Sequence, residues 1–148
     1  MSEDLATVFD LVRAGDAVAT RIERALGSWH GVGFRDLGVL LELRDAPDGV
    51  LPVAELATAV GSTAAEIVRR LGPLERIGVV VRTRDPADAR RTTVQLTEAG
   101  ATLATDAART ADEVARAGLH ERWTPAQLEA LREVLEPAAR PSGGFSRA

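Results

Sequence analysis

Two short helical segments joined at a single glycine constrain the fold of this chain more than any other feature. The stretch "VAELATAVG" has helical apolar spacing and closes at Gly61, and a second helix is predicted to start at once. Thr63 and Glu66 have the spacing of a capping box, in which each side chain accepts a backbone N–H of the opening turn. The expected buried face of this second helix is Ile67, Leu71, Leu74 and Ile77. Gly78 is placed to end it in a left-handed conformation, so the sequence predicts a helix-turn-helix.

A predicted β-hairpin follows directly. The stretch "VVVRTRDPADARRTTVQLT" alternates apolar and polar residues on both sides of Asp85-Pro86, where proline presets φ for a tight turn. Residues 69–91 hold seven arginines and three carboxylates, a net charge of +4 in a chain whose net charge is −4. We therefore expect the second helix and the hairpin to share one basic face.

Further predicted helices flank this region. Over residues 4–27 the apolar positions recur at alternating steps of three and four, which is a heptad pattern. These positions are Leu5, Val8, Val12, Gly15, Ala19, Ile22 and Leu26. The pattern fits an intramolecular core helix and a dimer-forming helix equally well. Thr97 is expected to cap a helix over about 98–118, and Thr124 with Gln127 to cap the last one. The fold class is therefore mainly α with a small β-wing.

Composition excludes several classes of function. The chain has no cysteine, so disulfides, thiolate metal sites and thiol nucleophiles are absent. Its two histidines, His30 and His120, have no further ligands at a recognisable spacing, and we expect no metal and no cofactor. No nucleophile and base stand at a catalytic spacing, which predicts that the protein is not an enzyme. No apolar run approaches the ~20 residues needed to span a bilayer, and we expect a cytoplasmic, nucleoid-associated protein with no membrane partner.

The order of elements, and above all "RDPADARRTTVQLTEAG", resembles the MarR family of winged helix-turn-helix transcription regulators. The most specific part is Asp88-x-Arg90, followed by Leu96-Thr97 and Gly100. The resemblance extends from the first helix to about Pro137. It implies a homodimer that binds a pseudo-palindromic operator in double-stranded DNA, and a small lipophilic or phenolic effector that changes the affinity, most simply by relieving repression of neighbouring genes.

The resemblance also implies a division of the chain. Residues 1–30 would form an N-terminal dimerisation helix, and residues 34–97 a winged helix-turn-helix DNA-binding region. Residues 98–138 would form the C-terminal dimerisation helices, and residues 139–148 a disordered tail. The alternative is a winged-helix module that binds proteins and no DNA, which a gel shift at low salt would distinguish because non-specific DNA binding should appear there.

The predicted DNA contacts of the second helix lie opposite its buried face. With Ile67 at the centre of that face, Ala65 and Arg69 point away from the core at about 100° per residue. Arg69 can donate two hydrogen bonds to guanine O6 and N7, and Ala65 allows close approach of the duplex. The remaining predicted contacts on this helix are Ser62 and Thr63, at a phosphate, and Arg70. Pro73 is expected to bend the helix, so that only its first turns enter the groove.

The arginines of the hairpin form the second group of predicted DNA contacts. Arg84, Arg90 and Arg91 would project beside the phosphate backbone, with Arg90 in the minor groove. Asp88 is interpreted as structural, because a carboxylate two residues before Arg90 can fix the turn and orient the guanidinium. The alternative is that these charges only keep an exposed strand edge soluble.

The few aromatic residues gather where the first helix meets the second. Trp29, His30 and Phe34 could line a pocket for the effector, with His30 donating a hydrogen bond to a carboxylate or a phenol. A core role in which these side chains join the two helices is the alternative, and the sequence favours it.

Overall fold

The computed structural model describes residues 2–84 and 92–139 of the chain. In order along the chain, its elements are α1 (Glu3–Trp29), α2 (Phe34–Asp45), the 3-10 turn η1 (Pro47–Gly49), β1 (Val50–Pro52), α3 (Val53–Ala59), α4 (Ala64–Arg76), β2 (Val80–Arg84), β3 (Thr92–Leu96), α5 (Glu98–His120) and α6 (Pro125–Ala139). The expected mainly helical fold with a small β-wing is confirmed. The tail expected over residues 139–148 lies outside the described residues except for Ala139, which ends α6.

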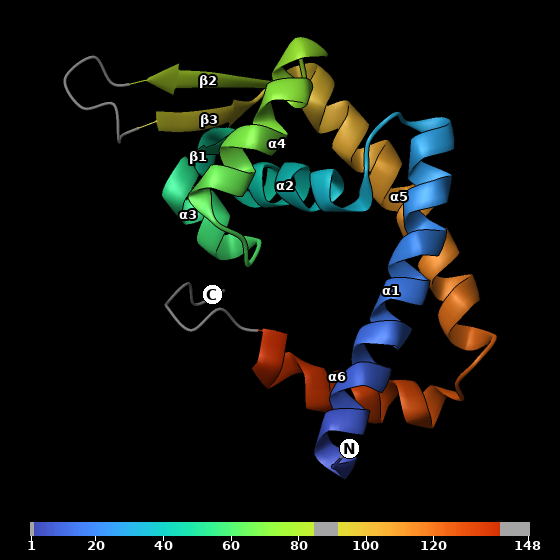
Figure 1. Ribbon diagram of the computed structural model, residues 1–148. Coiled ribbons are helices and arrows are strands. Elements are labelled where there is room, and N and C mark those ends of the chain that lie inside the picture. Colours follow the sequence, from blue (N-terminus) through green and yellow to red (C-terminus); the bar gives the residue numbers. More distant parts are fainter. Residues whose placement is uncertain (1, 85–91, 140–148) are drawn as a thin grey trace.

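The strands form an antiparallel sheet in the order β1-β3-β2. In the hairpin, Val80 of β2 faces Leu96 of β3, and Arg84 faces Thr92. β1 adds a short third strand on the other side of β3. Figure 1 shows the paired strands β2 and β3 extending outward from the helices, beyond α4. The sheet therefore anchors one end of the hairpin to the core and presents the other end outward.

The hydrophobic core lies among the C-terminal end of α1, the helices α2, α3, α4 and α5, and the sheet. Its largest fully buried side chains are Leu26, Leu37, Leu40, Leu43, Leu56, Ile67, Leu71, Val39, Val80 and Val94. The first turn of α5 approaches the start of β2 closely at Gly100, where a Cβ atom would stand 2.1 Å from the carbonyl oxygen of Val79. Any larger residue at position 100 would push α5 away from the sheet.

The two helices of the helix-turn-helix begin and end largely as the sequence predicts. Gly78, with a φ angle of +77°, has the expected left-handed conformation, and Gly61, which was expected to close the first helix, adopts the same conformation with a φ angle of +64°. Ile77 is the exception, because it was expected in the buried stripe and its side chain is 58% exposed. Ile77 comes after the last helical residue, Arg76, so its side chain no longer follows the helical spacing that buries Leu74. Helix α4 itself continues through Pro73.

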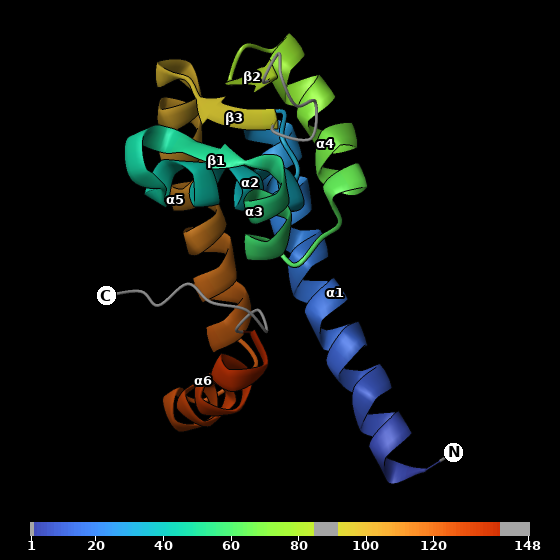
Figure 2. The ribbon, with the colours of Figure 1, turned by 90° about the vertical axis from the view of Figure 1, so that its left-hand side faces the viewer.

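Helix α1 packs on the rest of the chain only near its C-terminal end. Ile22 and Leu26 are buried, whereas Leu5, Val8 and Val12 are 46%, 54% and 53% exposed. Figure 2 shows the N-terminal part of α1 and helix α6 projecting from the remainder of the molecule and standing apart from each other. The heptad residues near the C-terminal end of α1 are therefore part of the core, whereas those near its N-terminal end form an uncovered apolar surface.

Candidate nucleic-acid interface

The first turn of α4 is capped by its own glutamate. Oε2 of Glu66 accepts hydrogen bonds from the Thr63 N–H at 3.0 Å and from the hydroxyls of Ser62 and Thr63, each at 2.9 Å. The Glu66 N–H donates to Oγ1 of Thr63, which completes the predicted capping box. These bonds, led by the one from the Thr63 backbone, lower the pKa of Glu66 from 4.5 to about 2.

This cap changes what the start of α4 can bind. Ser62 and Thr63 were expected to hold a DNA phosphate, but both hydroxyls donate to the carboxylate of Glu66. Glu66 therefore places a negative charge at the helix end that would otherwise favour an anion. The phosphate contacts of Ser62 and Thr63 remain predictions, and Glu66 is a residue of this surface that sequence reasoning treated only as a cap.

The outer face of α4 is exposed as expected. Ala65 and Arg69 are exposed, and the opposite side of the helix buries Ile67, Leu71 and Leu74. Within the described part of the chain, no ion pair or hydrogen bond engages the Arg69 guanidinium. The donors of Arg69 are therefore available to a partner outside the chain.

Arg70 differs from Arg69. It is only 31% exposed, and its Nη1 donates to Oδ1 of Asp36 in α2 at 3.0 Å. Asp36, Arg70, Arg69, Glu66 and Pro73 line a shallow hollow between α2 and the flank of α4. Sequence reasoning missed Asp36, and no local pattern could have found it, because the two partners lie 34 residues apart.

The base of the hairpin is tied to α4 by a second ion pair. Nε of Arg82 donates to Oε2 of Glu75 at 2.7 Å, its backbone N–H donates to Oε1 at 3.1 Å, and its Nη2 also contacts Oε2. The Arg82 guanidinium lowers the pKa of Glu75, although partial burial opposes the shift, and Glu75 in turn raises the pKa of Arg82. Arg82 thus has a structural role in holding β2 against α4, which the sequence analysis did not predict.

Of the hairpin residues predicted to contact DNA, Arg84 is exposed at the last position of β2. Its place opposite Thr92 puts it at the outward end of the paired strands. Arg90, Arg91 and the structural Asp88 lie outside the described residues. Their roles in the minor groove, at the backbone and in the turn therefore remain predictions.

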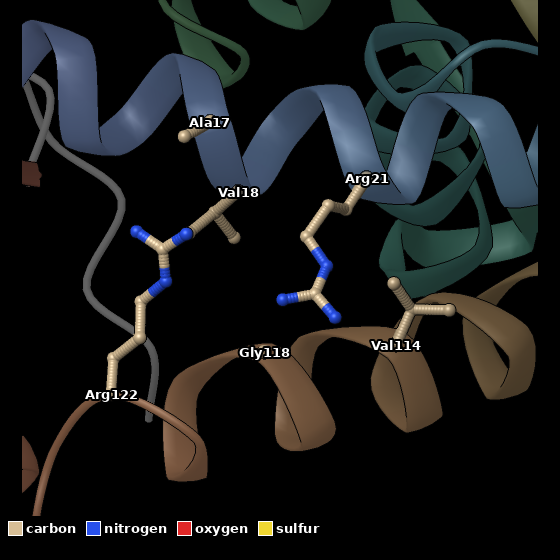
Figure 3. A pocket seen from close by; sticks show the side chains of 6 residues that line it. All are labelled: Ala17, Val18, Arg21, Val114, Gly118 and Arg122. Carbon is tan, nitrogen blue, oxygen red and sulfur yellow. The ribbon is translucent and has the colours of Figure 1, made fainter.

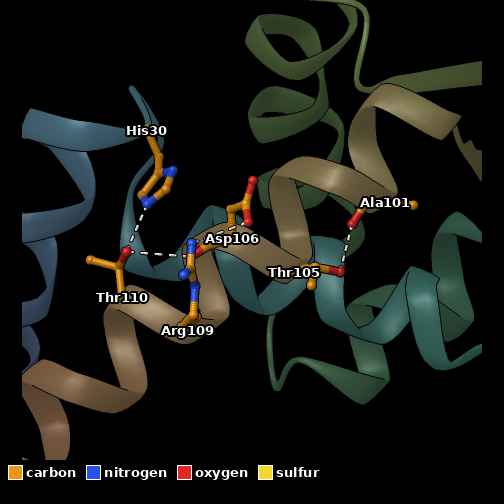
Figure 4. Close-up of polar contacts among 6 residues, drawn as sticks. All are labelled: His30, Ala101, Thr105, Asp106, Arg109 and Thr110. Carbon is orange, nitrogen blue, oxygen red and sulfur yellow. Dashed lines mark hydrogen bonds and ion pairs between the residues drawn. The ribbon is translucent and has the colours of Figure 1, made fainter.

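The aromatic residues at the junction of α1 and α2 do not form a core. Trp29 is 80% exposed and Phe34 is 38% exposed, so the core interpretation is wrong for Trp29. Position 29 is the last residue of α1, where the chain turns away before α2 covers it. Nε2 of His30 lies 2.9 Å from Oγ1 of Thr110 in α5, as Figure 4 shows. His30 therefore anchors the end of α1 to α5.

The hydrogen-bonding role of His30 in this contact depends on the tautomer of its ring. In the arrangement where the Thr110 hydroxyl donates to the Asp106 carbonyl oxygen at 3.3 Å, that hydroxyl accepts from Nε2 of His30. In the neutral ring the other nitrogen, Nδ1, then carries a lone pair. It can accept a hydrogen bond from a phenol hydroxyl, whereas donation to a ligand would need the charged ring.

A small hollow lies between α1 and α5, further from the sheet. Figure 3 shows its lining residues, Ala17, Val18, Arg21, Val114, Gly118 and Arg122. Arg21 donates to Oε2 of Glu121 at 2.9 Å, and this bond raises the pKa of Arg21 and lowers that of Glu121. The hollow does not include Trp29, His30 or Phe34, so it is separate from the expected effector site.

Among residues 2–84 and 92–139, no group of three or more metal-ligating side chains is close enough to hold an ion. No helix in those ranges is both long and apolar enough to cross a membrane.

A tight pair of helices, a three-stranded sheet with a projecting hairpin, and flanking helices on both sides together define a winged helix-turn-helix protein. A family model described as "MarR family" matches residues 30–91, which cover the helix-turn-helix and the hairpin. The chain is similar to the MarR family in sequence over residues 30–91 and in fold over almost its whole length. A comparison with curated protein sequences finds no match.

Solved structures are similar over almost the whole chain. A MarR family regulator from Streptomyces coelicolor, solved in complex with DNA, is 25% identical with a TM-score of 0.82 and covers 96% of this chain and 91% of its own. A MarR family regulator from Rhodococcus sp. RHA1 is 27% identical with a TM-score of 0.80, covering 97% and 99%. CouR from Rhodococcus jostii RHA1, bound to p-coumaroyl-CoA, is 29% identical with a TM-score of 0.75, covering 97% and 96%.

Proposed function

We propose that the protein is a homodimeric DNA-binding transcription regulator that represses neighbouring genes and is released by a small lipophilic or phenolic ligand. One observation carries this proposal: Arg69 stands exposed on the outer face of α4, while Glu75 and Arg82 tie the hairpin to the same helix. A helix with an exposed guanidinium beside a cationic hairpin is suited to the recognition of double-stranded DNA. The DNA complex of the Streptomyces relative supports it.

A second copy of the chain would complete the structure. The uncovered large apolar side chains of α1 and α6 include Leu5, Val8, Phe9, Leu11, Val12, Val134 and Leu135. An apolar surface of this kind is costly in water and is a feature of subunit interfaces. We propose that residues 1–30 and 98–138 form the dimer contacts, and that residues 34–97 form the DNA-binding region.

Dimer geometry supplies a mechanism for regulation. Two recognition helices must lie ~34–36 Å apart to enter successive major grooves of a pseudo-palindromic operator. A ligand that binds better to a dimer with another separation lowers the affinity for DNA. The structure of CouR with p-coumaroyl-CoA supports a ligand of this general class.

We place the effector at the end of α1, where Trp29 and Phe34 offer exposed aromatic surface and Nδ1 of His30 can accept a hydrogen bond from a phenol. This site adjoins the short link from α1 to α2. We assign no enzymatic activity and no cofactor to the protein, and we place it in the cytoplasm at the nucleoid.

DNA binding is tested by fluorescence anisotropy with a labelled duplex of random sequence at low salt, followed by selection of preferred duplexes from random DNA. The logarithm of the binding constant should fall linearly with the logarithm of the salt concentration, and this result would support the proposal. A complete lack of binding at low salt would contradict it and favour the protein-interaction module.

A further inference from the structure

Three hydrogen bonds, joined through the backbone of Gly33 and Phe34, connect α1 to the recognition helix α4. At the α4 end, Arg70 donates to Oδ1 of Asp36 at 3.0 Å. The other carboxylate oxygen of Asp36, Oδ2, accepts the backbone N–H of Gly33 at 3.0 Å. Asp36 lies in the first turn of α2, and Gly33 is the residue just before that helix. One carboxylate therefore holds both the link between α1 and α2 and a side chain of α4.

The series continues into α1. The backbone N–H of Phe34 donates to Oε2 of Glu23 at 2.5 Å, and Glu23 belongs to α1. Gly33 allows this approach because it has no side chain: a Cβ atom there would stand 2.6 Å from Oε1 of Glu23 and 3.2 Å from Oδ2 of Asp36. Two carboxylates from two helices thus converge on the link, and one of them reaches α4.

Arg70 occupies the flank of α4 and not its outer face. Consecutive residues of a helix differ by about 100° around the axis, so Arg69 and Arg70 point in clearly different directions. Arg69 is exposed and makes no ion pair in the described ranges, whereas Arg70 faces α2 and is paired. Asp36 is only 25% exposed, which protects the pair in part from solvent and salt.

An ion pair of this exposure contributes little to stability, but it restricts geometry. It opposes any rotation of α4 relative to the first turn of α2, because such a rotation would separate Nη1 of Arg70 from Asp36 or break the bond to Gly33. For a dimer that must present two helices at a fixed separation, this angle decides whether both enter the groove.

We propose that Asp36 and Arg70 are positioning residues that set the angle of α4 against the end of α1, and that Arg70 acts through Asp36 instead of contacting a DNA phosphate. The inference rests on the proposed DNA-binding function. It departs from the sequence-based expectation that Arg70 contacts DNA. It also gives the effector site a route to the interface, because Trp29 and Phe34 lie on either side of the link that Asp36 holds.

The two roles of Arg70 predict opposite results. If Arg70 is a positioning residue, Arg70→Ala and Asp36→Ala each weaken specific binding about 3- to 30-fold, and the double variant is no weaker than the worse single one. The slope of log affinity against log salt stays at the wild-type value, because no phosphate contact is lost. If Arg70 binds a phosphate, Arg70→Ala lowers that slope by about one, and Asp36→Ala strengthens binding by releasing the arginine.

The relative affinity for operators with different half-site spacings is a second measurement, and partial unfolding alone would not change it. The probe is a duplex selected from random DNA with the wild-type protein, together with versions whose half-sites are moved apart by one or two base pairs. A positioning role predicts that Arg70→Ala and Asp36→Ala bind the altered spacings nearly as well as the selected one. A protein that is only partly unfolded would lose affinity for all spacings by the same factor.

Two control variants make the test specific. Asp36→Asn retains an oxygen that can accept the Gly33 N–H but removes the charge, so it separates the ion pair from the helix cap. Asp45→Asn breaks the exposed Arg44–Asp45 pair at the other end of α2 and should leave binding and spacing preference unchanged.

The test also separates this inference from the proposed function. Wild-type protein that binds no duplex at low salt would overturn the proposed function. Wild-type protein that binds DNA, with a salt slope that drops for Arg70→Ala or an affinity that rises for Asp36→Ala, would overturn the inference alone. Unchanged affinity and spacing preference in both variants would overturn it as well.

Discussion

Glu75 holds Arg82 at both its backbone and its side chain. One oxygen of the carboxylate accepts the Arg82 N–H at 3.1 Å, and the other accepts Nε at 2.7 Å. The two residues lie in α4 and β2, on opposite sides of the turn at Gly78. The contact therefore sets the position of the hairpin relative to the recognition helix, and a dimer would repeat it in both subunits.

Replacing Glu75 should loosen the hairpin more than it destabilises the protein. Glu75→Ala removes every acceptor of this contact, and we expect a loss of about 1 kcal/mol in the free energy of unfolding, since the pair is partly exposed. Denaturant titration measures that loss. Glu75→Gln is the matched control, because its amide oxygen can still accept the Arg82 N–H, and it should lose less. Equal losses in the two variants would show that the backbone bond is unimportant.

The capping carboxylate of Glu66 should make stability depend on acid. Its pKa is lowered to about 2 in the folded protein, so its stabilising contribution is fully present above about pH 4.5 and is lost as the pH falls towards 2. Comparing thermal melts of the wild type and Glu66→Gln between pH 2 and 7 measures this. The difference in Tm should be constant at the upper end and shrink below pH 4.5. A constant difference across the whole range would contradict the assignment.

The same residue should weaken DNA binding in the wild-type protein. Glu66 places a carboxylate at the end of α4 where a phosphate was expected, so Glu66→Gln should raise the affinity for any duplex by about fivefold at low salt, and by less as salt rises. Anisotropy titrations with random and selected duplexes measure this effect. A lower affinity in Glu66→Gln, with an intact fold, would mean that the carboxylate itself contacts a base.

Local features of the fold could be predicted from the sequence because they depend on neighbouring residues. The Thr63 and Thr124 caps form the hydrogen bonds that their spacing to Glu66 and Gln127 implies. Gly78 adopts the predicted left-handed conformation, which glycine takes readily at a helix end. Such rules act over three or four residues and need no knowledge of packing.

The polar contacts that orient α4 could not be predicted, because they join residues that are far apart in the sequence. Asp36 meets Arg70 only because α2 packs beside α4, and no sequence periodicity connects positions 34 residues apart. The exposure of Trp29 was also unpredictable, since a large aromatic residue between two helices is ordinarily buried. In both cases the deciding information is the path of the chain between elements.

Arg69 and Arg90 should differ in how they affect specificity. Arg69→Ala should lower the affinity for a selected duplex by roughly 5- to 150-fold and relax preference at one base position, because a bidentate contact to guanine is lost. Arg90→Ala, which concerns a residue beyond the described ranges, should weaken binding to every duplex and reduce the salt slope by about one. Titrations at four salt concentrations with selected and random duplexes distinguish these outcomes. An unchanged salt slope for Arg90→Ala would remove it from the set of phosphate contacts.

The uncovered apolar surface of α1 gives the last prediction. Val8 is 54% exposed in the single chain, and burial of Asp at this position in an interface would leave an unpaired charge. Val8→Asp should therefore raise the dimer dissociation constant by at least about tenfold, as measured by sedimentation equilibrium. DNA affinity should fall with it, because one subunit can occupy only one half-site.

The control for this experiment is Arg13→Ala, which changes a side chain that is 77% exposed on the same helix and lies outside the heptad positions. It should leave the dimer intact. If Val8→Asp remained as dimeric as the wild type, the N-terminal half of α1 would lie outside the interface. The dimer would then have to form through another surface, and the spacing of the two recognition helices would no longer depend on α1.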